Sequence, residues 1–598
     1  MIMRCLKSHL ILSSIVMAAA VVVATSLAYA SGPLLVVNGK PVLWPHREIR
    51  GGPLNSQTVD ASGHVLYRVD SGPLGPLNNS QATAIVDRIF KLYTDIPTAN
   101  IEFMNAGRIM DPATGNPVDV TGANAGKFIG KNPTFQNPII FDSDGSITGG
   151  GGVLGFFGFL QFDDPVTPSE LQEGFVVLNG ASLTRGSLSV TSFLGVFTHE
   201  FGHFAGPLDH AQINGNIAES GTESTVPQGF NSAQAFDLYA PFTETLYPFI
   251  FDAPSGSLLG SQFKDSGFFV ASLDLDTQNG LSNLYPTPDY LASRGSIEGR
   301  VLLKVGSSEI PVSGINAIAR RIDQGAYPPP IGTPAFPGAP TIDSDGVPQI
   351  PPAQASTDSL STVASAVTGL DFGPGTFRIQ GLPPGQYMVE IQQINPNAIK
   401  GSGIGPLSAQ FPLPAREEFF NGPGSSSNLA SVFLPVTVFA GQVTTGIDFV
   451  INGISSATPA VVNEKEPNDK TAKAQRVDIP VELSGSASST DDALLRINLP
   501  DGTTDFIEDL YKFSVDQSRI VFIILEPTSG SGDLDMYLFT SGVNKKKTSL
   551  SDPNLLSFSA GPTANEMIAF QLDPGAYIVG VSAFSGSLNY KLRIVTTQ

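Results

Sequence analysis

Three of the six histidines of the chain, His199, His203 and His210, fall within one short stretch, FTHEFGHFAGPLDH. His199 and His203 are four residues apart, so on a helix both imidazoles project from the same side, one turn apart. Two such imidazoles can ligate one Zn²⁺ ion, and Glu200 between them can reach a water molecule that the ion has made acidic. The spacing therefore predicts a zinc centre with Glu200 as general base.

The residues after His203 are expected to end the helix and turn the chain. Gly206 permits a left-handed turn, and Pro207 cannot continue the helical hydrogen bonds. The turn sends the chain back toward the ion, which makes His210 available as a third ligand and leaves water at the fourth position. A pair of histidines that arose by chance would not be expected to have a helix stop and a third histidine beside it.

The elements that must position these residues follow from hydrophobic periodicity. The ligand-bearing segment is expected as a helix over 191–205, with phenylalanines roughly opposite the histidines. Strands are expected at 63–69, 101–103, 138–141 and 174–178, and helices at 79–93 and 275–284, the last capped by Asp274 or Asp276. A strand, a helix and a strand in succession predict an α/β unit.

The pattern changes after residue 294 to short alternating strands. They are expected at 297–301, 315–319, 377–379, 387–391 and 447–451, and, beyond a polar linker, at 511–513, 520–525, 534–539, 568–572 and 577–581. Regular short strands with turns between them favour β-sandwiches.

The residues His199 to Gly206 resemble the first part of HExxHxxGxxH, the signature of metzincin zinc endopeptidases. The flanking region, 65–286, resembles secreted bacterial matrixin-like enzymes. In that family the third histidine follows the second by six residues, where this sequence has Asp209, with His210 one residue later. The third ligand is therefore His210 by its chemistry or Asp209 by the count. We expect His210, because a neutral imidazole suits borderline-soft zinc.

The same resemblance assigns the floor and walls of the site. The stretch 245–249 resembles the matrixin Met-Tyr-Pro turn beneath the metal, with Leu246 in place of the methionine, a residue of similar volume. Tyr247 and Pro248 would form one wall of a substrate-binding pocket. Residues 174–178 would be the edge strand that extended peptides join by backbone pairing.

Two further resemblances divide the rest of the chain. Motifs at 297–301, 311–314 and 377–387 resemble a carboxypeptidase regulatory-like domain, a prealbumin-like β-sandwich. Motifs at 464–469, 509–513, 532–537 and 574–577 resemble a bacterial pre-peptidase C-terminal domain, a jelly-roll-like β-sandwich. Related domains bind Ca²⁺ through acidic residues near their start. The hard oxygen ligands expected here are Glu464, Glu466, Asn468 and Asp469, with an acidic solvated linker as the alternative.

The first thirty residues predict export. Arg4 and Lys7 precede an apolar run over 10–27, and Ala28-Tyr29-Ala30 supplies a small-residue cleavage point, so we expect a secretory signal peptide cleaved near Ala30, with a retained membrane anchor as the alternative. The single cysteine, Cys5, lies in this leader, so the mature chain has no disulfide. A net charge of −21 disfavours nucleic acid and anionic membranes as partners.

Taken together, these observations predict a multidomain protein with an α/β metzincin-like catalytic domain followed by two all-β sandwich domains. The expected divisions are a signal peptide (1–30), the protease domain (31–290), the regulatory-like sandwich (295–453), a linker (454–463) and the C-terminal sandwich (464–598). The expected function is that of a secreted zinc endopeptidase that hydrolyses extracellular proteins through Glu-assisted attack of a zinc-bound water, with Ca²⁺ as a second candidate ion. The alternative is a secreted binding or adhesion protein whose protease-like domain is inactive.

Overall fold

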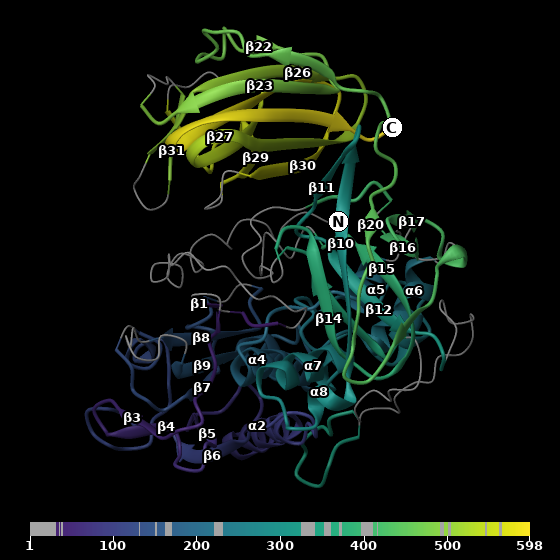
Figure 1. Cartoon of the computed structure of the whole chain (residues 1–598). Coiled ribbons are helices and arrows are strands. Elements are labelled where there is room, and N and C mark those ends of the chain that lie inside the picture. The colour runs from purple at the N-terminus through teal and green to yellow at the C-terminus, as the bar shows by residue number, and fades with distance from the viewer. Residues whose placement is uncertain are drawn as a thin grey trace.

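The structure, a computed structural model, describes residues 32–598 except 35, 38–39, 131, 150–151, 162–169, 221–230, 325–340, 352–359, 370–372, 396–410, 416, 491–494, 500–503, 544–546 and 561–564. The predicted signal peptide and its cleavage point lie outside this part of the chain. The described residues fold mostly into β-sheets, several of them arranged as sandwiches (Figure 1). None of the helices in this part of the chain is long and apolar enough to cross a bilayer.

The first region is built on a seven-stranded mixed sheet with the order β3-β4-β5-β7-β9-β8 and with β6 beside β5. Its strands are β3 (Ile49–Gly51), β4 (Ser56–Val59), β5 (Val65–Val69), β6 (Phe103–Arg108), β7 (Pro138–Asp142), β8 (Gly155–Gln161) and β9 (Leu171–Asn179). A ribbon of β1 (Val36–Val37) and β2 (Lys40–Pro41) precedes them. The neighbours β5, β7 and β9 run parallel, and β8 runs antiparallel to β9.

Both faces of this sheet are buried, as the apolar runs in β7 and β9 require. On β7, Phe141 faces the cluster that holds the two long helices, and Ile140 faces a smaller cluster on the opposite side. Phe90 of one helix stacks on Phe201 of the other with ring centroids 4.3 Å apart. The helices of the region are α2 (Asn79–Thr94), α3 (Gly180–Thr184), α4 (Val190–Ala205), α5 (Asn214–Ser220), α6 (Ser232–Tyr239), α7 (Leu275–Leu284) and α8 (Tyr290–Ser293).

The helices α2, α4 and α7 are present where periodicity predicted them, and Asp274 caps α7 by accepting the backbone N–H of Thr277. Two strand predictions need correction. The strand expected at 101–103 begins only at Phe103. The segment 174–178 is not an edge strand, because β8 pairs along its outer side and is itself the last strand in the order. The phenylalanines and glycines of β8 do not alternate with polar residues, so periodicity gave no signal for it.

The second region consists of two sheets around one core. One contains β10 (Gly295–Val305), β11 (Ser308–Pro311), β14 (Thr376–Leu382), β19 (Val443–Thr444) and β20 (Phe449–Val450). The other contains β12 (Asn316–Arg321), β13 (Val363–Val367), β15 (Gly385–Gln392), β16 (Glu417–Gly422), β17 (Ser425–Ser427) and β18 (Val436–Val438). Along β12, Ala317 and Ala319 enter the core between the sheets, while Ile318 belongs to a different cluster on the opposite face.

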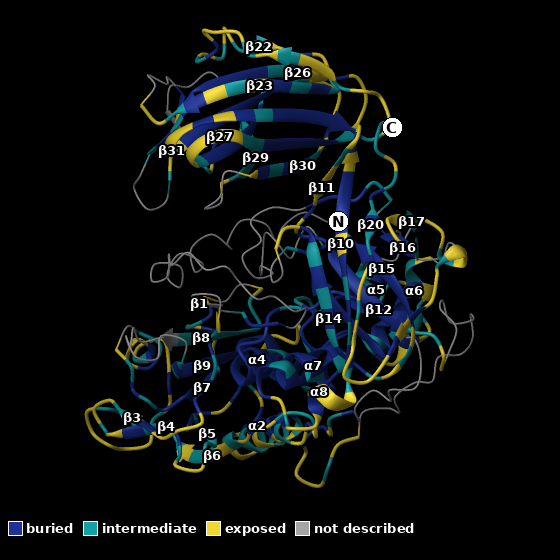
Figure 2. Cartoon of the chain, viewed as in Figure 1, coloured by how far each residue is buried: buried dark blue, intermediate teal, exposed yellow. Residues whose placement is uncertain are grey.

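That opposite face of β12 and β15 packs against the first region. Met388 and Phe419 of the second region share one apolar cluster with Phe236 and Tyr247 of the first. All four side chains are buried, and Figure 2 shows β12 and β15 buried along most of their length. The two regions are therefore joined by a common core.

The last region is a sandwich at the end of the molecule opposite the first sheet (Figure 1). Its larger sheet contains β21 (Ala460–Asn463), β22 (Gln475–Arg476), β23 (Val481–Ser488), β26 (Asp509–Val515), β27 (Arg519–Thr540), β29 (Leu555–Ser559), β30 (Glu566–Leu572) and β31 (Gly575–Thr596). The smaller sheet contains β24 (Leu495–Asn498), β25 (Thr504–Ile507) and β28 (Lys547–Ser549). Because β21 pairs with β23, the segment 454–463 contributes a strand at its end instead of serving as a linker throughout.

Candidate metal centre

The helix α4 carries His199 and His203 on one side. His199 is partly exposed there, and His203 is buried. Ser189 caps the helix by accepting the N–H of Ser192, and most of its other side chains are buried (Figure 2). Phe197 and Phe201 fix the helix to the core on the face opposite the histidines. The Nε2 atoms of His199 and His203 lie 3.1 Å apart. The i, i+4 spacing thus brings the two imidazoles together, as expected on a helix.

The turn after α4 brings the third histidine to the same place. Potential ligand atoms of His199, His203 and His210 all lie within 4.8 Å of one another. The ring centroid of His210 is 5.2 Å from that of His199 and 4.7 Å from that of His203. Asp209 is not part of this group; it is buried, and its Oδ1 accepts the backbone N–H of His210 at 2.8 Å. His210, and not Asp209, therefore lies beside His199 and His203. The identity of the metal stays a prediction.

The helix ends at Ala205, but not by the left-handed turn that Gly206 was expected to supply. Gly206 has a φ of −127°, a conformation open to any residue. A Cβ atom at this position would lie 2.8 Å from Leu281 Cδ1 of α7, so glycine lets that leucine pack closely without a shift of its side chain.

The hydrogen bonds at Nδ1 aim both helix imidazoles at a common point. His199 Nδ1 lies 3.1 Å from the carbonyl oxygen of Thr245, and His203 Nδ1 lies 2.6 Å from that of Leu208. A carbonyl can only accept, so each Nδ1 carries the proton and each Nε2 presents a lone pair. Two lone pairs facing each other at this distance are unfavourable unless a cation lies between them. The donor set therefore fits a divalent metal, and the carbonyls are the outer partners that orient such ligands.

Burial also favours the ligand form of these histidines. Removal from water, together with the charge of His210, lowers the pKa of His199 to about 3. Burial likewise holds the pKa of His203 well below its ordinary value. Neutral imidazole is the form that binds metals. Both imidazoles therefore stay neutral, with Nε2 free of a proton, over the whole neutral range.

Glu200 lies against the edge strand of the sheet. It is buried, and the backbone N–H of Phe157 in β8 bonds to its carboxylate. Burial outweighs this bond and raises the pKa of Glu200 to about 8. The packing is tight, since a Cβ atom at Gly155 would lie 2.9 Å from Glu200 Cγ. A carboxyl group with such a pKa can both take up and release a proton near neutral pH.

The floor of the site is formed by Leu246, the residue at the methionine position of the resembling family. It is completely buried, and the segment it belongs to supplies the carbonyl that holds His199. A Cβ atom at Gly202 of α4 would lie 2.7 Å from Leu246 Cδ2 and 2.9 Å from the hydroxyl of Tyr93. The Leu246 side chain therefore packs against the helix at Gly202, which lies between His199 and His203.

We expect Gly202→Ala to lower the free energy of unfolding by up to about 2 kcal/mol, because overpacking outweighs the helix propensity that alanine adds. Denaturant unfolding at a fixed zinc concentration measures the change. In a Leu246→Ala background, where the space is open, the same substitution should be neutral or stabilising. Equal effects in the two backgrounds would contradict the proposed packing.

An N-terminal segment, residues 32–34, supports the turn that leads to His210, a contact that the sequence did not predict. The N–H of Asp209 donates to Gly32 O at 2.7 Å, and the N–H of Leu34 donates to Pro207 O. Pro33 and Leu208 form an antiparallel bridge between the two segments. Such a pairing of distant segments leaves no local pattern in the sequence, since neither has the alternation of a strand.

The structure does not place the ring of Tyr247 in a substrate-binding wall. Tyr247 is 2% exposed, and its ring packs on Gly215, where an added Cβ would lie 2.5 Å away. Its hydroxyl donates to Glu219 and accepts from Asn395 Nδ2 at 3.3 Å. Tyr247 therefore joins the first and second regions, which corrects the expectation for this side chain. Pro248 is only half-buried and stays a candidate.

The last sandwich contains the second candidate centre. Ligand oxygens of Glu464, Glu466 and Asp509 lie within 4.8 Å of one another. Asn468 is fully buried; its Nδ2 donates to Glu464 Oε1 at 3.1 Å, while its Oδ1 has no hydrogen-bond partner among the described residues. Asp469 lies outside the group, although its Oδ1 is also buried and without a partner in the described structure. Glu466 is exposed, so the segment is solvated in part, and its order around Asn468 is what favours a binding site.

Asp509 was not among the expected ligands, although its motif had been noted. It begins β26 and is brought beside Glu464 by the sheet; Tyr590 donates its hydroxyl to Asp509 Oδ2 at 2.7 Å. Burial and the charge of Glu464 raise the pKa of Asp509. A cation with hard-oxygen preference would offset this concentration of carboxylates, so the donor set fits Ca²⁺.

Comparisons with known proteins found short similarities of shape. No protein-family model and no curated protein matches the chain. Among solved structures, the pre-peptidase C-terminal domain of a Bacillus anthracis collagenase is matched over 22% of this chain and 99% of that one, with 15% identity and a TM-score of 0.16. A periplasmic inhibitor of g-type lysozyme from Aeromonas hydrophila is matched over 23% and 100%, with 11% identity and a TM-score of 0.14. A carbohydrate-binding module of a Cellvibrio mixtus lichenase is matched over 20% and 88%, with 12% identity and a TM-score of 0.11.

Proposed function

We propose that this protein is a secreted zinc endopeptidase with a metzincin-like catalytic domain. The observation that carries the proposal is the convergence of three imidazoles, from His199, His203 and His210, beside the buried carboxyl of Glu200. The resemblance of 199–206 to the metzincin signature supports the same activity. The leader of the sequence supports secretion, and the divisions 31–290, 295–453 and 464–598 remain our prediction for the domains.

The chain's own residues define the steps of the proposed reaction. Zinc, when bound by the three histidines, supplies a Lewis acid that polarises a carbonyl and acidifies water. Glu200 accepts the proton of the attacking water and passes it to the leaving amine. Thr245 and Leu208 hold the imidazoles in the required tautomer through their carbonyl oxygens.

The position of Glu200 supports an extended peptide as substrate. Among the described residues β8 pairs on one side only, with β9. The outer side of β8 therefore offers backbone groups to which an extended peptide can add as a further strand. Because Phe157 of β8 bonds to Glu200, a peptide bound along this strand lies next to the general base.

A metal and activity assay on the mature protein tests this function. We expect about one zinc per chain by atomic emission and cleavage of casein or gelatin, lost on chelation and restored by zinc. Zinc binding without cleavage would favour the alternative, a secreted binding or adhesion protein with an inactive protease-like domain. A protein that binds no zinc would remove the proposal.

We also propose that the last sandwich binds Ca²⁺ through Glu464, Glu466, Asn468 and Asp509. Calcium at about 100 times its Kd is expected to stabilise the folded state by about 2.7 kcal/mol. Calorimetry should therefore show a higher unfolding temperature for this sandwich with calcium than with a chelator. Asn468→Ala should reduce the difference, whereas Asp516→Asn, at a side chain that is 84% exposed, should preserve it. An unfolding temperature of the wild type that calcium leaves unchanged would contradict the site.

A further inference from the structure

The segment 211–215, directly after His210, is bound by one carboxylate of the first region, that of Glu244. Glu244 is 1% exposed and accepts the backbone N–H groups of Ile213, Asn214 and Gly215 at 3.1, 2.5 and 3.1 Å. The N–H of Ala211 donates to Leu246 O at 3.0 Å. The segment 211–215 is thus held by the same stretch that forms the floor under the histidines.

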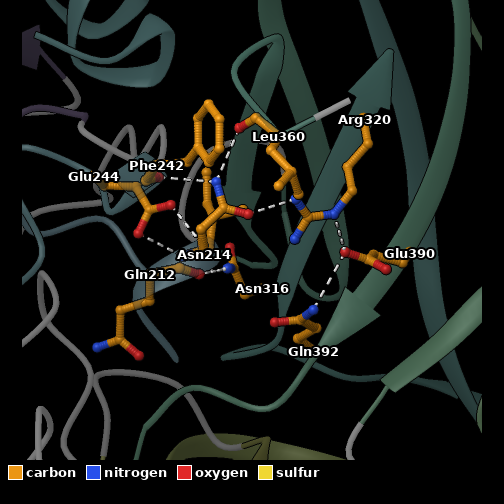
Figure 3. A network of polar contacts seen from close by, with 10 residues as sticks. Gln212, Asn214, Phe242, Glu244, Asn316, Arg320, Leu360, Glu390 and Gln392 are labelled. Carbon is orange, nitrogen blue, oxygen red and sulfur yellow. Dashed lines mark hydrogen bonds and ion pairs between the residues drawn. The ribbon is translucent and has the colours of Figure 1, made fainter. Parts of the chain in front are cut away.

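The two-sheet sandwich of the second region, called the second sandwich below, holds the other side of the segment 211–215 (Figure 3). Arg320 Nη1 donates to Asn214 Oδ1 at 2.7 Å, and Asn214 Nδ2 donates to Leu360 O at 2.9 Å. Asn316 Nδ2 donates to Gln212 O, and the backbone N–H of Asn395 donates to Gln212 Oε1 at 2.7 Å. Asn214 also donates to Phe242 O of the first region at 2.9 Å, so its amide connects both regions.

The face of the second region that makes these contacts is buried and carries polar side chains among apolar ones. Alternation along β12 directs Asn316, Ile318 and Arg320 away from the core of the sandwich. Arg320 is completely buried, and its Nε donates to Glu390 Oε1 at 2.8 Å. A buried ion pair contributes little net stability after desolvation, so its value lies in fixing orientation. Here it aims the guanidinium at Asn214.

We propose that Asn214 is a positioning residue for the third metal ligand, held in place by the second sandwich. His210 lies outside any helix or strand, so the position of its imidazole depends on the two ends of its loop. One end is bridged to the N-terminal segment 32–34 and the other is fixed at Asn214. The second sandwich is therefore part of the support of the metal centre. This inference rests on the proposed zinc function.

The test compares Asn214→Ala with the wild type in the full-length chain. Losing a direct hydrogen-bond partner of a metal ligand typically lowers metal affinity by about 10- to 100-fold. Asn214 acts on His210 through the backbone between them, so we expect the zinc Kd to rise by about 10-fold, the lower end of that range. Chelator competition measures the Kd, and the d–d spectrum of the Co²⁺ form should also change. Amide hydrogen exchange should be faster in a peptide covering 206–216. Asn316→Ala, which removes one contact to Gln212, should act in the same direction with a smaller effect.

Glu418→Ala is the matched control, because Glu418 is also buried in the second sandwich but bonds to Ser426 and Asn452 within it. It should lower the unfolding temperature and leave the zinc Kd unchanged. Wild-type zinc affinity in both Asn214→Ala and Asn316→Ala overturns the inference and leaves the proposed function standing. A wild-type protein that binds no zinc overturns both.

Discussion

Glu200→Gln is expected to lower the rate of peptide-bond cleavage by about 10²- to 10⁴-fold, the usual contribution of one general acid–base residue. Glutamine has nearly the same shape and keeps an oxygen that can accept the N–H of Phe157, so the fold and the metal should be retained. It cannot take up the proton of an attacking water. The kcat with a fluorogenic peptide, together with the zinc content of the same sample, measures the effect.

Two results would contradict this role of Glu200. Cleavage by Glu200→Gln at the wild-type rate would mean that another group takes up the proton. Loss of zinc from the variant would mean that the carboxylate supports the metal centre. The control is Glu170→Gln, a partly exposed carboxylate that bonds to Arg47, which should change neither the rate nor the zinc content.

His210→Ala is expected to weaken zinc binding by more than the 10- to 100-fold that is typical of losing an outer partner of a ligand, because it removes a direct ligand. Cleavage should fall to the level of the metal-free protein. Asp209→Asn is the matched variant: the amide oxygen can still accept the N–H of His210, and zinc binding should stay close to that of the wild type. Equilibrium dialysis against a zinc buffer series measures both affinities.

The opposite order of affinities would identify Asp209 as the ligand and would require the turn after Pro207 to rearrange when the metal binds. Similar losses in both variants would mean that the negative charge of Asp209, whose Oδ1 lies 3.6 Å from His210 Nδ1, is also needed to position the imidazole. The Co²⁺ spectrum separates these cases, since it reports the number and kind of ligand atoms.

What the sequence could predict of the site lies within short stretches. The spacing of His199 and His203, the cap of α7 by Asp274 and the stop after Ala205 all depend on local backbone geometry. His210 could be preferred to Asp209 by its chemistry alone. The prediction that 174–178 forms the sheet edge was wrong, because it was carried over from a resemblance and the intervening strand β8 had no periodic signal.

What the sequence could not predict depends on pairings between distant segments. The segment 32–34 meets the turn before His210, and Asp509 joins Glu464 only because the sheet places β26 beside it. Tyr247 is buried in a cluster that includes Met388 of the second region, and its hydroxyl bonds to Asn395 of that region. None of these contacts leaves a trace in a window of a few residues, since the partners are set by tertiary packing.

The shared core of the first two regions has a consequence for the order of events during synthesis. The strands that carry Arg320 and Glu390 are translated long after the helix with His199 and His203, and the support of Asn214 is complete only when they have folded. A partly made chain therefore has the contacts of Glu244 to this loop but lacks those of Arg320 and Leu360 to Asn214. Under the proposed function, full zinc affinity would then require that the second region has been made and has packed against the first.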